Sequence, residues 1–258
     1  LDKPVFMQYL HWLGGVFQGD LGESIYYHED VGKVLWERFP VTLDLVIKSF
    51  IISNLLGIGL GLLAAVRRGK WLDTFATVLS YVGVSVPVFW LGIILIYVFG
   101  LKLSWFPIAG YTFPWVNLWR NLYQSVLPVF CISLMGWAVI ARQMRSSVLE
   151  VISQDYVRTA WSKGLPERTV VLRHIVKNSL IPVITLMAIG LGISVGGQVF
   201  VEQVFNIPGV GRLLVQSILG QDYPIVQSAT LIIAVLISLF NLLADISYGW
   251  FDPRVRYG

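Results

Sequence analysis

The chain offers few side chains with which an enzyme could do chemistry. Its three histidines, His11, His28 and His174, lie far apart in the sequence, and Cys131 is the only cysteine. No cluster has the spacing of metal ligands or of a nucleophile with its base, and no G-x-x-x-x-G-K-[ST] loop is present to bind nucleotide phosphates. The sequence therefore predicts no catalytic residues, no metal site and no cofactor bound by this chain.

One basic segment, residues 142–177, is the most informative polar part of the chain. It holds seven Lys or Arg against three Asp or Glu, an excess equal to the formal charge of +4 of the whole chain. Apolar residues recur at helical spacing from Leu149 to Ala160, Gly164 suits the position after a helix, and Pro166 suits the first turn of another. The pattern predicts two helices joined by a sharp turn, which a soluble partner could grip. The alternatives are a loop that is basic only through topology, and a lipid-headgroup patch.

Composition shows which kind of protein must position this segment. Of 258 residues, 56% are hydrophobic and 13% charged, whereas an average soluble domain is about 45–50% apolar and about 25% charged. So few charges cannot cover a soluble globule, which argues against a soluble enzyme, a disordered chain and a disulfide scaffold. The excess of +4 is also small for a nucleic-acid-binding protein. The composition predicts an all-α, polytopic membrane protein.

Five windows of 18 to 28 residues contain no charged side chain, and a helix needs about 20 residues to cross a hydrocarbon core. The first window becomes long enough when it is extended back to Val41, which places Asp44 and Lys48 at a helix end as an i,i+4 pair of interfacial charges. The predicted spans are 41–66, 74–101, 121–141, 178–201 and 223–246.

The distribution of Lys and Arg predicts the orientation of these spans. Segments 67–70 and 142–177 and the tail 254–258 are basic and therefore cytoplasmic, whereas 1–40 and 202–222 lie outside. An external start without a signal peptide leads us to expect a sixth span upstream of Leu1.

Both external segments carry amphipathic patterns. Within 1–40, residues 4–21 predict an amphipathic helix. Within 202–222, a turn at Pro208-Gly209 precedes a predicted short helix, with Leu213, Leu214 and Ile218 facing the membrane. Asp222 is placed to cap the last span.

Glycine and proline mark packing points inside the predicted spans. The pairs Gly57–Gly61 and Gly192–Gly196 have the GxxxG spacing that lets helix backbones approach closely. Pro87, Pro128 and Pro182 are each expected to kink a helix or to mark its start.

The charge-free windows also indicate where the energy for any transport by this chain would come from. Coupled transporters commonly place ionisable residues inside their spans, and these windows have none. If the chain transports a solute, the energy is expected from another polypeptide. Ser194 and Gln198 share a helix face and are candidates to border a pathway.

Residues 156–165, Tyr-Val-Arg-Thr-Ala-Trp-Ser-Lys-Gly-Leu, resemble the coupling (EAA) loop of ABC importer permeases. Their Arg-Thr-Ala form, followed by Arg173-His174 and Ile181-Pro182, resembles the oligopeptide/dipeptide (and nickel) family. Residues 83–92 and 202–224 resemble two further signatures of that family, and the similarity extends over about 1–253, most like its B-type subunit. The sequence departs from the general pattern in having Arg158 where many importers have Glu.

The resemblance implies a type I ABC importer transmembrane-domain fold, with 41–253 as the permease domain, 142–177 as its coupling loop and 202–222 near the external gate. The residues it implies for ATPase coupling are Tyr156, Arg158, Thr159, Ala160, Lys163, Gly164 and Leu165. With Ser194 and Gln198, the candidates for the pathway or gate are Glu202, Phe205, Pro208 and Gly209.

The function implied is import of di- or oligopeptides across the cytoplasmic membrane of a prokaryote. The implied partners are a homologous C-type permease, two ATPase subunits that bind ATP and Mg, an extracytoplasmic solute-binding protein and membrane lipid. Import of nickel or another small solute, a secondary transporter or channel, and a non-transporting anchor are the alternatives.

Overall fold

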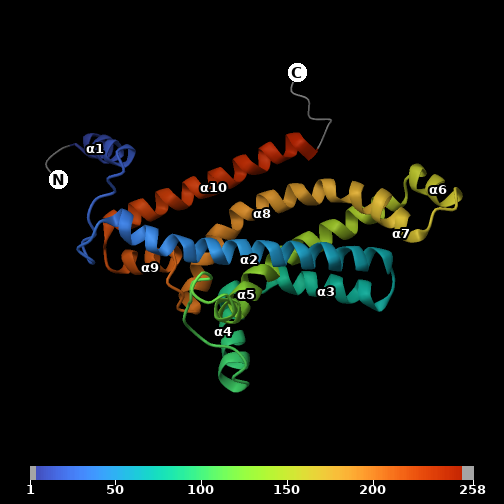
Figure 1. The fold of residues 1–258 in the computed structure, drawn as a ribbon, viewed down its shortest axis with the longest axis horizontal. Coiled ribbons are helices and arrows are strands. Elements are labelled where there is room, and N and C mark those ends of the chain that lie inside the picture. Colours follow the sequence, from blue (N-terminus) through green and yellow to red (C-terminus); the bar gives the residue numbers. More distant parts are fainter. Residues whose placement is uncertain (1–3, 252–258) are drawn as a thin grey trace.

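A computed structural model describes residues 4–251, which form an elongated bundle of helices (Figure 1). Within this part of the chain, strand pairing is limited to an isolated bridge between Glu23 and Asp30. The elements are α1 Val5–Phe17, α2 Val31–Val66, α3 Trp71–Ser85, α4 Val88–Leu95, the π-helix η1 Ile96–Lys102, α5 Leu118–Ile152, α6 Asp155–Ser162, α7 Glu167–Thr169, the π-helix η2 Val170–Val176, α8 Lys177–Val204, α9 Val210–Leu219 and α10 Tyr223–Phe251.

The α2–α5 pair forms the centre of the bundle, and its glycines explain the close packing. A Cβ at Gly57 would lie 2.7 Å from Ile140 Cβ, and one at Gly61 would meet the Ala141 carbonyl oxygen. The first GxxxG prediction is therefore confirmed. In the second pair, a Cβ at Gly192 would lie 2.9 Å from Asn241 Oδ1 of α10, whereas nothing lies within 4 Å at Gly196, so only Gly192 makes a close approach.

This packing predicts the effect of Gly61→Val. The new side chain would meet the backbone of Ala141 as well as Met144, and a backbone cannot move aside as a side chain can. We expect α2 and α5 to separate, with a loss of about 1–3 kcal/mol in the free energy of unfolding. Gly59→Val is the matched control, because nothing lies within 4 Å of a Cβ at Gly59. Thermal unfolding in detergent compares the two, and equal stabilities would contradict the packing argument.

Among the described residues, four helices are long and apolar enough to cross a membrane, and the pair α3–α4 with η1 is a candidate for a fifth. Within the predicted span 74–101 the helix is broken, and its two halves meet at 106°, at the proline that the sequence predicts to kink a helix or to mark its start. Val86 is extended (φ −80°, ψ 122°) and is followed by Pro87, a residue that disfavours helical backbone before it. α4 therefore leaves the bundle, as Figure 1 shows.

Two helix boundaries in the structure differ from those predicted from the sequence. Helix α2 begins at Val31, after Asp30 accepts a hydrogen bond from Lys33 N (2.9 Å), so Asp44 and Lys48 lie well inside the helix and not at its end. Helix α5 runs to Ile152, so residues 142–152 belong to this long helix and the cytoplasmic turn begins only at Ser153.

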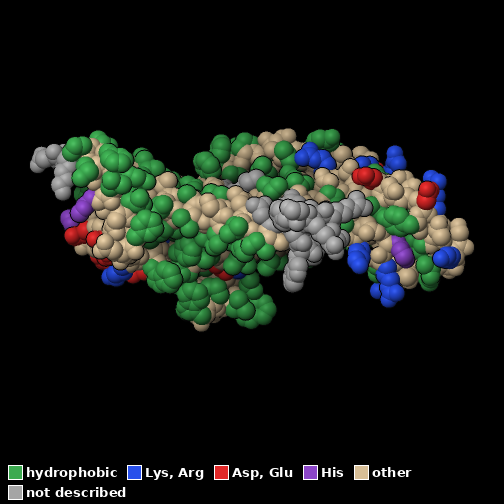
Figure 2. Space-filling model, turned by 90° about the horizontal axis from the view of Figure 1, so that it is seen from above, with side chains coloured by type: hydrophobic (Ala, Val, Ile, Leu, Met, Phe, Trp, Pro, Cys, Tyr) green, Lys and Arg blue, Asp and Glu red, His purple; other side chains and the backbone are tan. Residues whose placement is uncertain are grey.

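The two ends of the bundle differ in chemistry. α1 and α9 lie at one end and α6 and α7 at the other (Figure 1). Lys and Arg gather at the α6–α7 end of the face shown in Figure 2, and the middle of that face is largely apolar. This polarity fits the orientation expected from the sequence.

The N-terminal region contains a helix where the amphipathic pattern predicts one. α1 spans Val5–Phe17 and buries none of its residues. The predicted cytoplasmic tail, 254–258, lies outside the described residues.

Candidate functional site

The cytoplasmic end is built around a sharp turn at Gly164. Its φ of +72° is a left-handed conformation that favours glycine. Gly164 N donates to Trp161 O (2.9 Å) and Leu165 N donates to Ala160 O (3.5 Å), the paired bonds of a Schellman motif. The turn predicted from the sequence is confirmed, although the first helix is α6 alone and does not include Leu149 and Ile152.

This hairpin rests on a small apolar base. Val157 and Ala160 of α6 pack with Val170 and Ile175 of η2, all of them buried. On the other side, Asn178 Nδ2 donates to the Tyr156 hydroxyl (3.2 Å) and links α6 to α8. The hairpin therefore packs against the end of α5 and the start of α8.

The structure separates the seven predicted coupling residues into two groups. Ala160 is buried in the base of the hairpin, so it supports the surface and does not belong to it. The other six are exposed: Tyr156, Arg158, Thr159, Lys163, Gly164 and Leu165. Arg158 lies 3.8 Å from Asp155 in an exposed ion pair, which contributes little stability and leaves its guanidinium free to meet a partner.

At the opposite end, Glu202 is a fully buried carboxylate near the end of α8. Its Oε1 accepts a hydrogen bond from the Thr42 hydroxyl of α2 (2.6 Å), and its Oε2 accepts one from Arg212 N of α9 (3.0 Å). Thr42 Oγ1 in turn accepts from Val210 N (2.9 Å). We call Glu202, Thr42 and these two α9 amides the external latch, because they join three helices.

The predicted turn at Pro208-Gly209 closes over this carboxylate. A Cβ at Gly209 would overlap the carboxylate of Glu202, so the motif needs glycine there. Phe205 is buried in the apolar core of the bundle, and Pro208 is partly buried. The prediction that Leu213 faces the membrane is wrong, because it is buried among Val31, Leu35, Val210 and Ile225.

Ser194 and Gln198 share a helix face but line different spaces. Ser194 lines a cavity of about 230 Å³ between α2, α4, α5 and α8. Gln198 is fully buried beside a void of about 10 Å³ near Thr42. The structure does not bring these two candidates to one surface.

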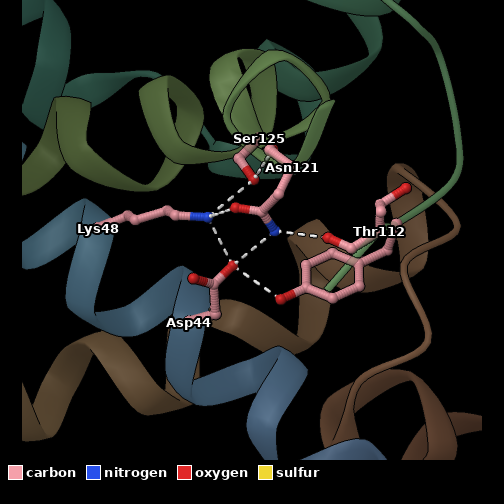
Figure 3. A network of polar contacts seen from close by, with 6 residues as sticks. Asp44, Lys48, Thr112, Asn121 and Ser125 are labelled. Carbon is pink, nitrogen blue, oxygen red and sulfur yellow. Dashed lines mark hydrogen bonds and ion pairs between the residues drawn. The ribbon is translucent and has the colours of Figure 1, made fainter. Parts of the chain in front are cut away.

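Asp44 and Lys48 form the predicted i,i+4 pair, with Nζ to Oδ2 of 2.6 Å, but they are not interfacial charges. Their side chains are only 15% and 17% exposed. Lys48 Nζ also donates to Asn121 and Ser125 of α5, and Asp44 accepts from the Tyr111 hydroxyl (2.8 Å) (Figure 3). The network joins α2 to α5 and to the loop before it.

Asp222 anchors the N-terminal segment to the α9–α10 corner. Its carboxylate accepts from the Ser24 hydroxyl (2.5 Å) and from the backbone N–H groups of Tyr26 and Ile25. Burial alone would raise the pKa of Asp222, but the hydrogen bonds from Ser24, Tyr26 and Ile25 outweigh it and hold the pKa below its ordinary value. Asp222 also caps α10 through Ile225 N (3.5 Å), as predicted.

The sequence provided no signal for a further bidentate pair near the cytoplasmic end. Arg145 Nε and Nη2 of α5 donate to Asp73 Oδ1 (2.6 Å) and Oδ2 (2.9 Å) of α3. Asp73 also accepts from Gly69 N (3.0 Å) in the α2–α3 turn. The two residues are 72 positions apart, so no local pattern could pair them.

Fold and site together define a polytopic helical membrane subunit with a packed hairpin at its basic end and a buried latch at the other. Within residues 4–251, no group of three or more His, Cys, Asp or Glu side chains could hold a metal ion. The buried polar groups described above connect helices to one another.

Residues 57–257 match the family model described as "Binding-protein-dependent transport system inner membrane component", and the chain belongs to this family. The family is one of membrane permease subunits and not of enzymes.

Full-length relatives agree with this assignment. The chain is 39% identical over 260 residues to the oligopeptide transport system permease protein AppB of Bacillus subtilis (strain 168), covering 100% of this chain and 82% of AppB. It is 42% identical over 258 residues to a Brucella abortus (strain 2308) protein provisionally named a peptide transport system permease, with the same coverage.

Solved structures show the fold. The membrane subunit of the MetNI methionine ABC transporter, crystallised in inward-facing conformations, superposes with a TM-score of 0.70 at 16% identity, over 85% of this chain and 96% of that one. An amino acid ABC transporter solved with histidines gives a TM-score of 0.65 at 15% identity, over 84% and 93% of the two chains. The fold is that of type I ABC importer transmembrane subunits.

Proposed function

We propose that this chain is a membrane subunit of an ATP-driven importer that carries di- or oligopeptides across the cytoplasmic membrane of a prokaryote. The observation that supports a peptide substrate is the 39–42% identity over the whole chain to permeases named for peptide transport. A binding-protein-dependent importer of this family works with ATPase subunits and a solute-binding protein. The finer partners proposed are a homologous C-type permease and two ATPase subunits that bind ATP and Mg.

The path of the helices supports a mechanism. From Glu167, next to the cytoplasmic turn, α7, η2 and α8 continue one into the next as far as Val204, a run about 55 Å long at about 1.5 Å per residue. Its far end carries Glu202 of the external latch. When the ATPase subunits close on ATP, their motion would enter at the hairpin and reach the external corner through this helix, tilting the bundle between inward- and outward-open states.

Uptake by the complete reconstituted complex tests this proposal. The complex in proteoliposomes, with ATP inside and its binding protein outside, should accumulate a labelled tripeptide, and uptake should stop without ATP. Uptake of nickel without uptake of peptide would show that the substrate is nickel and not a peptide. Uptake that survives ATP depletion but collapses with the proton gradient would indicate a secondary transporter. Assembly with an ATPase, without substrate-stimulated hydrolysis, would indicate an anchor.

Gly164→Pro tests the coupling hairpin. Proline cannot adopt the φ of +72° and has no N–H to donate to Trp161 O, so the Schellman turn should be lost. We expect peptide uptake to fall at least about tenfold, as expected when a coupling step loses about 1.4 kcal/mol or more. ATP hydrolysis should no longer respond to the loaded binding protein, while membrane insertion is retained.

Gly69→Pro is the matched control for this substitution. Gly69 also has a positive φ of +77° in a cytoplasmic turn, and its N–H also makes a hydrogen bond, to Asp73. Peptide uptake per ATP hydrolysed should stay close to that of the unmodified complex. Normal uptake by Gly164→Pro, or an equal loss in both variants, would show that the hairpin has no special part in coupling.

A further inference from the structure

The turn between α2 and α3 holds three exposed cations, Arg67, Arg68 and Lys70, which we call the turn cations. The turn lies at the same end of the bundle as α6 and α7 (Figure 1). It is tight, because Lys70 N donates to Arg67 O (3.0 Å) and Gly69 has a φ of +77°. None of the turn cations forms an ion pair with another described residue. Like charges held so close together repel one another, so the turn favours an anionic partner.

The nearest acidic side chain is directed away from this surface. Asp73 is the only acid in the sequence between Asp44 and Glu150, and it is buried. Its two oxygens accept from Arg145 of α5 (2.6 and 2.9 Å), and one of them also accepts from Gly69 N. Because Asp73 is already paired with a cation of α5, it leaves the charge of the turn cations available at the surface.

An exposed apolar stripe on α3 begins directly at this turn. Its members recur at i, i+4, i+7 and i+11, they are 73%, 53%, 54% and 47% exposed, and we call them the α3 stripe: Trp71, Phe75, Val78 and Val82. A tryptophan between cations and an apolar helix face is typical of a membrane–water interface. The stripe is about 16 Å long at about 1.5 Å per residue, which is about half of a hydrocarbon core of about 30 Å. It therefore has the depth of one leaflet.

We infer that this surface binds an anionic phospholipid of the cytoplasmic leaflet, with its phosphate at the turn cations and an acyl chain along the α3 stripe. An ATPase subunit would meet the cations but would leave the apolar stripe uncovered. A second permease would cover the stripe but would leave the cations without anions. A phospholipid matches both parts in one molecule, and the cytoplasmic leaflet carries the negative charge that the cations require.

Two triple variants distinguish a lipid site from the general positive charge of this end. The first replaces the turn cations with glutamine. The control removes the same charge from exposed positions of the cytoplasmic segment that follows α6, with the substitutions Arg168→Gln, Arg173→Gln and Lys177→Gln. Because all six side chains are exposed, both variants should unfold in detergent without added lipid at the temperature of the unmodified chain.

Native mass spectrometry of the full chain in detergent, with equal amounts of phosphatidylglycerol and phosphatidylcholine of identical acyl chains, measures the lipid retained. The unmodified chain should retain more phosphatidylglycerol. Loss of the turn cations should lower its retention at least about tenfold, since each cation near an anionic lipid contributes a factor of about five, and phosphatidylcholine should be unaffected. The control should change phosphatidylglycerol retention less than about twofold.

The α3 stripe is tested separately with Phe75→Ser. Retention of both lipids should fall to the same extent, because the stripe contacts acyl chains and these are identical in the two lipids. Glycerol phosphate, which has the anionic group without the acyl chains, should not displace phosphatidylglycerol at equal concentration. Displacement would show that the turn binds small anions and not a lipid, and would overturn the inference.

The other outcomes also overturn it. An equal loss of phosphatidylglycerol in the two triple variants would mean that the lipid responds to the overall potential of the cytoplasmic end and not to this turn. If the assembled complex loses its ATPase without the turn cations, while the chain retains phosphatidylglycerol normally, the occupant is the ATPase. If Phe75→Ser releases a second permease and leaves lipid retention unchanged, the stripe is a subunit interface.

Discussion

Replacing Lys48 with methionine should destabilise the chain by about 3–5 kcal/mol, the cost of removing one partner from a buried ion pair. Methionine keeps most of the volume of the lysine stem but removes the three donors that Nζ directs to Asp44, Asn121 and Ser125. Asp44 would then keep only the Tyr111 hydroxyl and the Asn121 amide as donors. A carboxylate with only neutral partners in a nearly buried site is poorly stabilised.

The chain contains its own control for this prediction. Lys33 pairs with Glu29 at the same i,i+4 spacing and at 3.0 Å, but the two side chains are 61% and 49% exposed. Lys33→Met should therefore cost no more than about 0.5 kcal/mol. The double variant Asp44→Asn with Lys48→Met should recover part of the loss, because no charge is left unpaired. Unfolding in detergent by heat or denaturant gives the comparison, and equal effects of the two lysine substitutions would refute the buried network.

The Asp44–Lys48 pair also shows how far sequence reasoning reaches. Spacing alone predicts that the two side chains meet, because i,i+4 residues are neighbours on any helix. Their burial depends on Tyr111 and Asn121, which lie 67 and 77 positions from Asp44. No local pattern carries that information, so the sequence places the pair at a helix end in the interface.

The charge-free windows predict where helices are long enough to span a membrane but not whether they stay straight. At Val86-Pro87 the sequence allowed either a kink or a helix start, and the structure has a break of 106°. The turn at Gly164 is likewise set locally, by a glycine followed by Pro166. Local chemistry therefore predicts that the chain turns at Gly164 and that the helix breaks at Pro87, whereas the angle of the break depends on what the two halves pack against.

Glu202 is the clearest case of a residue whose environment cannot be predicted from the composition of the sequence around it. It lies one position beyond a charge-free window, where a charge is expected to face water, yet it is fully buried. Its partners, Thr42 and Arg212 N, come from a helix 160 residues away and from the far side of a turn. The family resemblance selected Glu202 as a gate candidate without indicating what it holds.

Glu202→Leu should therefore open the external corner. Leucine fills the space but accepts nothing, which leaves the Thr42 hydroxyl and Arg212 N–H without the acceptor they now share. At about 1–3 kcal/mol for each buried unpaired group, the loss should be about 4 kcal/mol. Because both groups hold α9, its backbone amides should exchange with solvent faster than those of α5. Hydrogen exchange followed by mass spectrometry on residues 205–219 measures this directly.

Glu202→Gln and Gln203→Leu are the controls that distinguish loss of the latch hydrogen bonds from a general effect of substitution at this end of α8. The glutamine amide can accept from Arg212 N–H through its oxygen and donate to Thr42 Oγ1 through its nitrogen, so it should cost less than about 1 kcal/mol. Gln203 is exposed on the next position of the same helix, and its replacement should change neither stability nor exchange. If Glu202→Leu leaves exchange in α9 as slow as Glu202→Gln does, the corner is held by apolar packing around Leu213, and the buried carboxylate has another role.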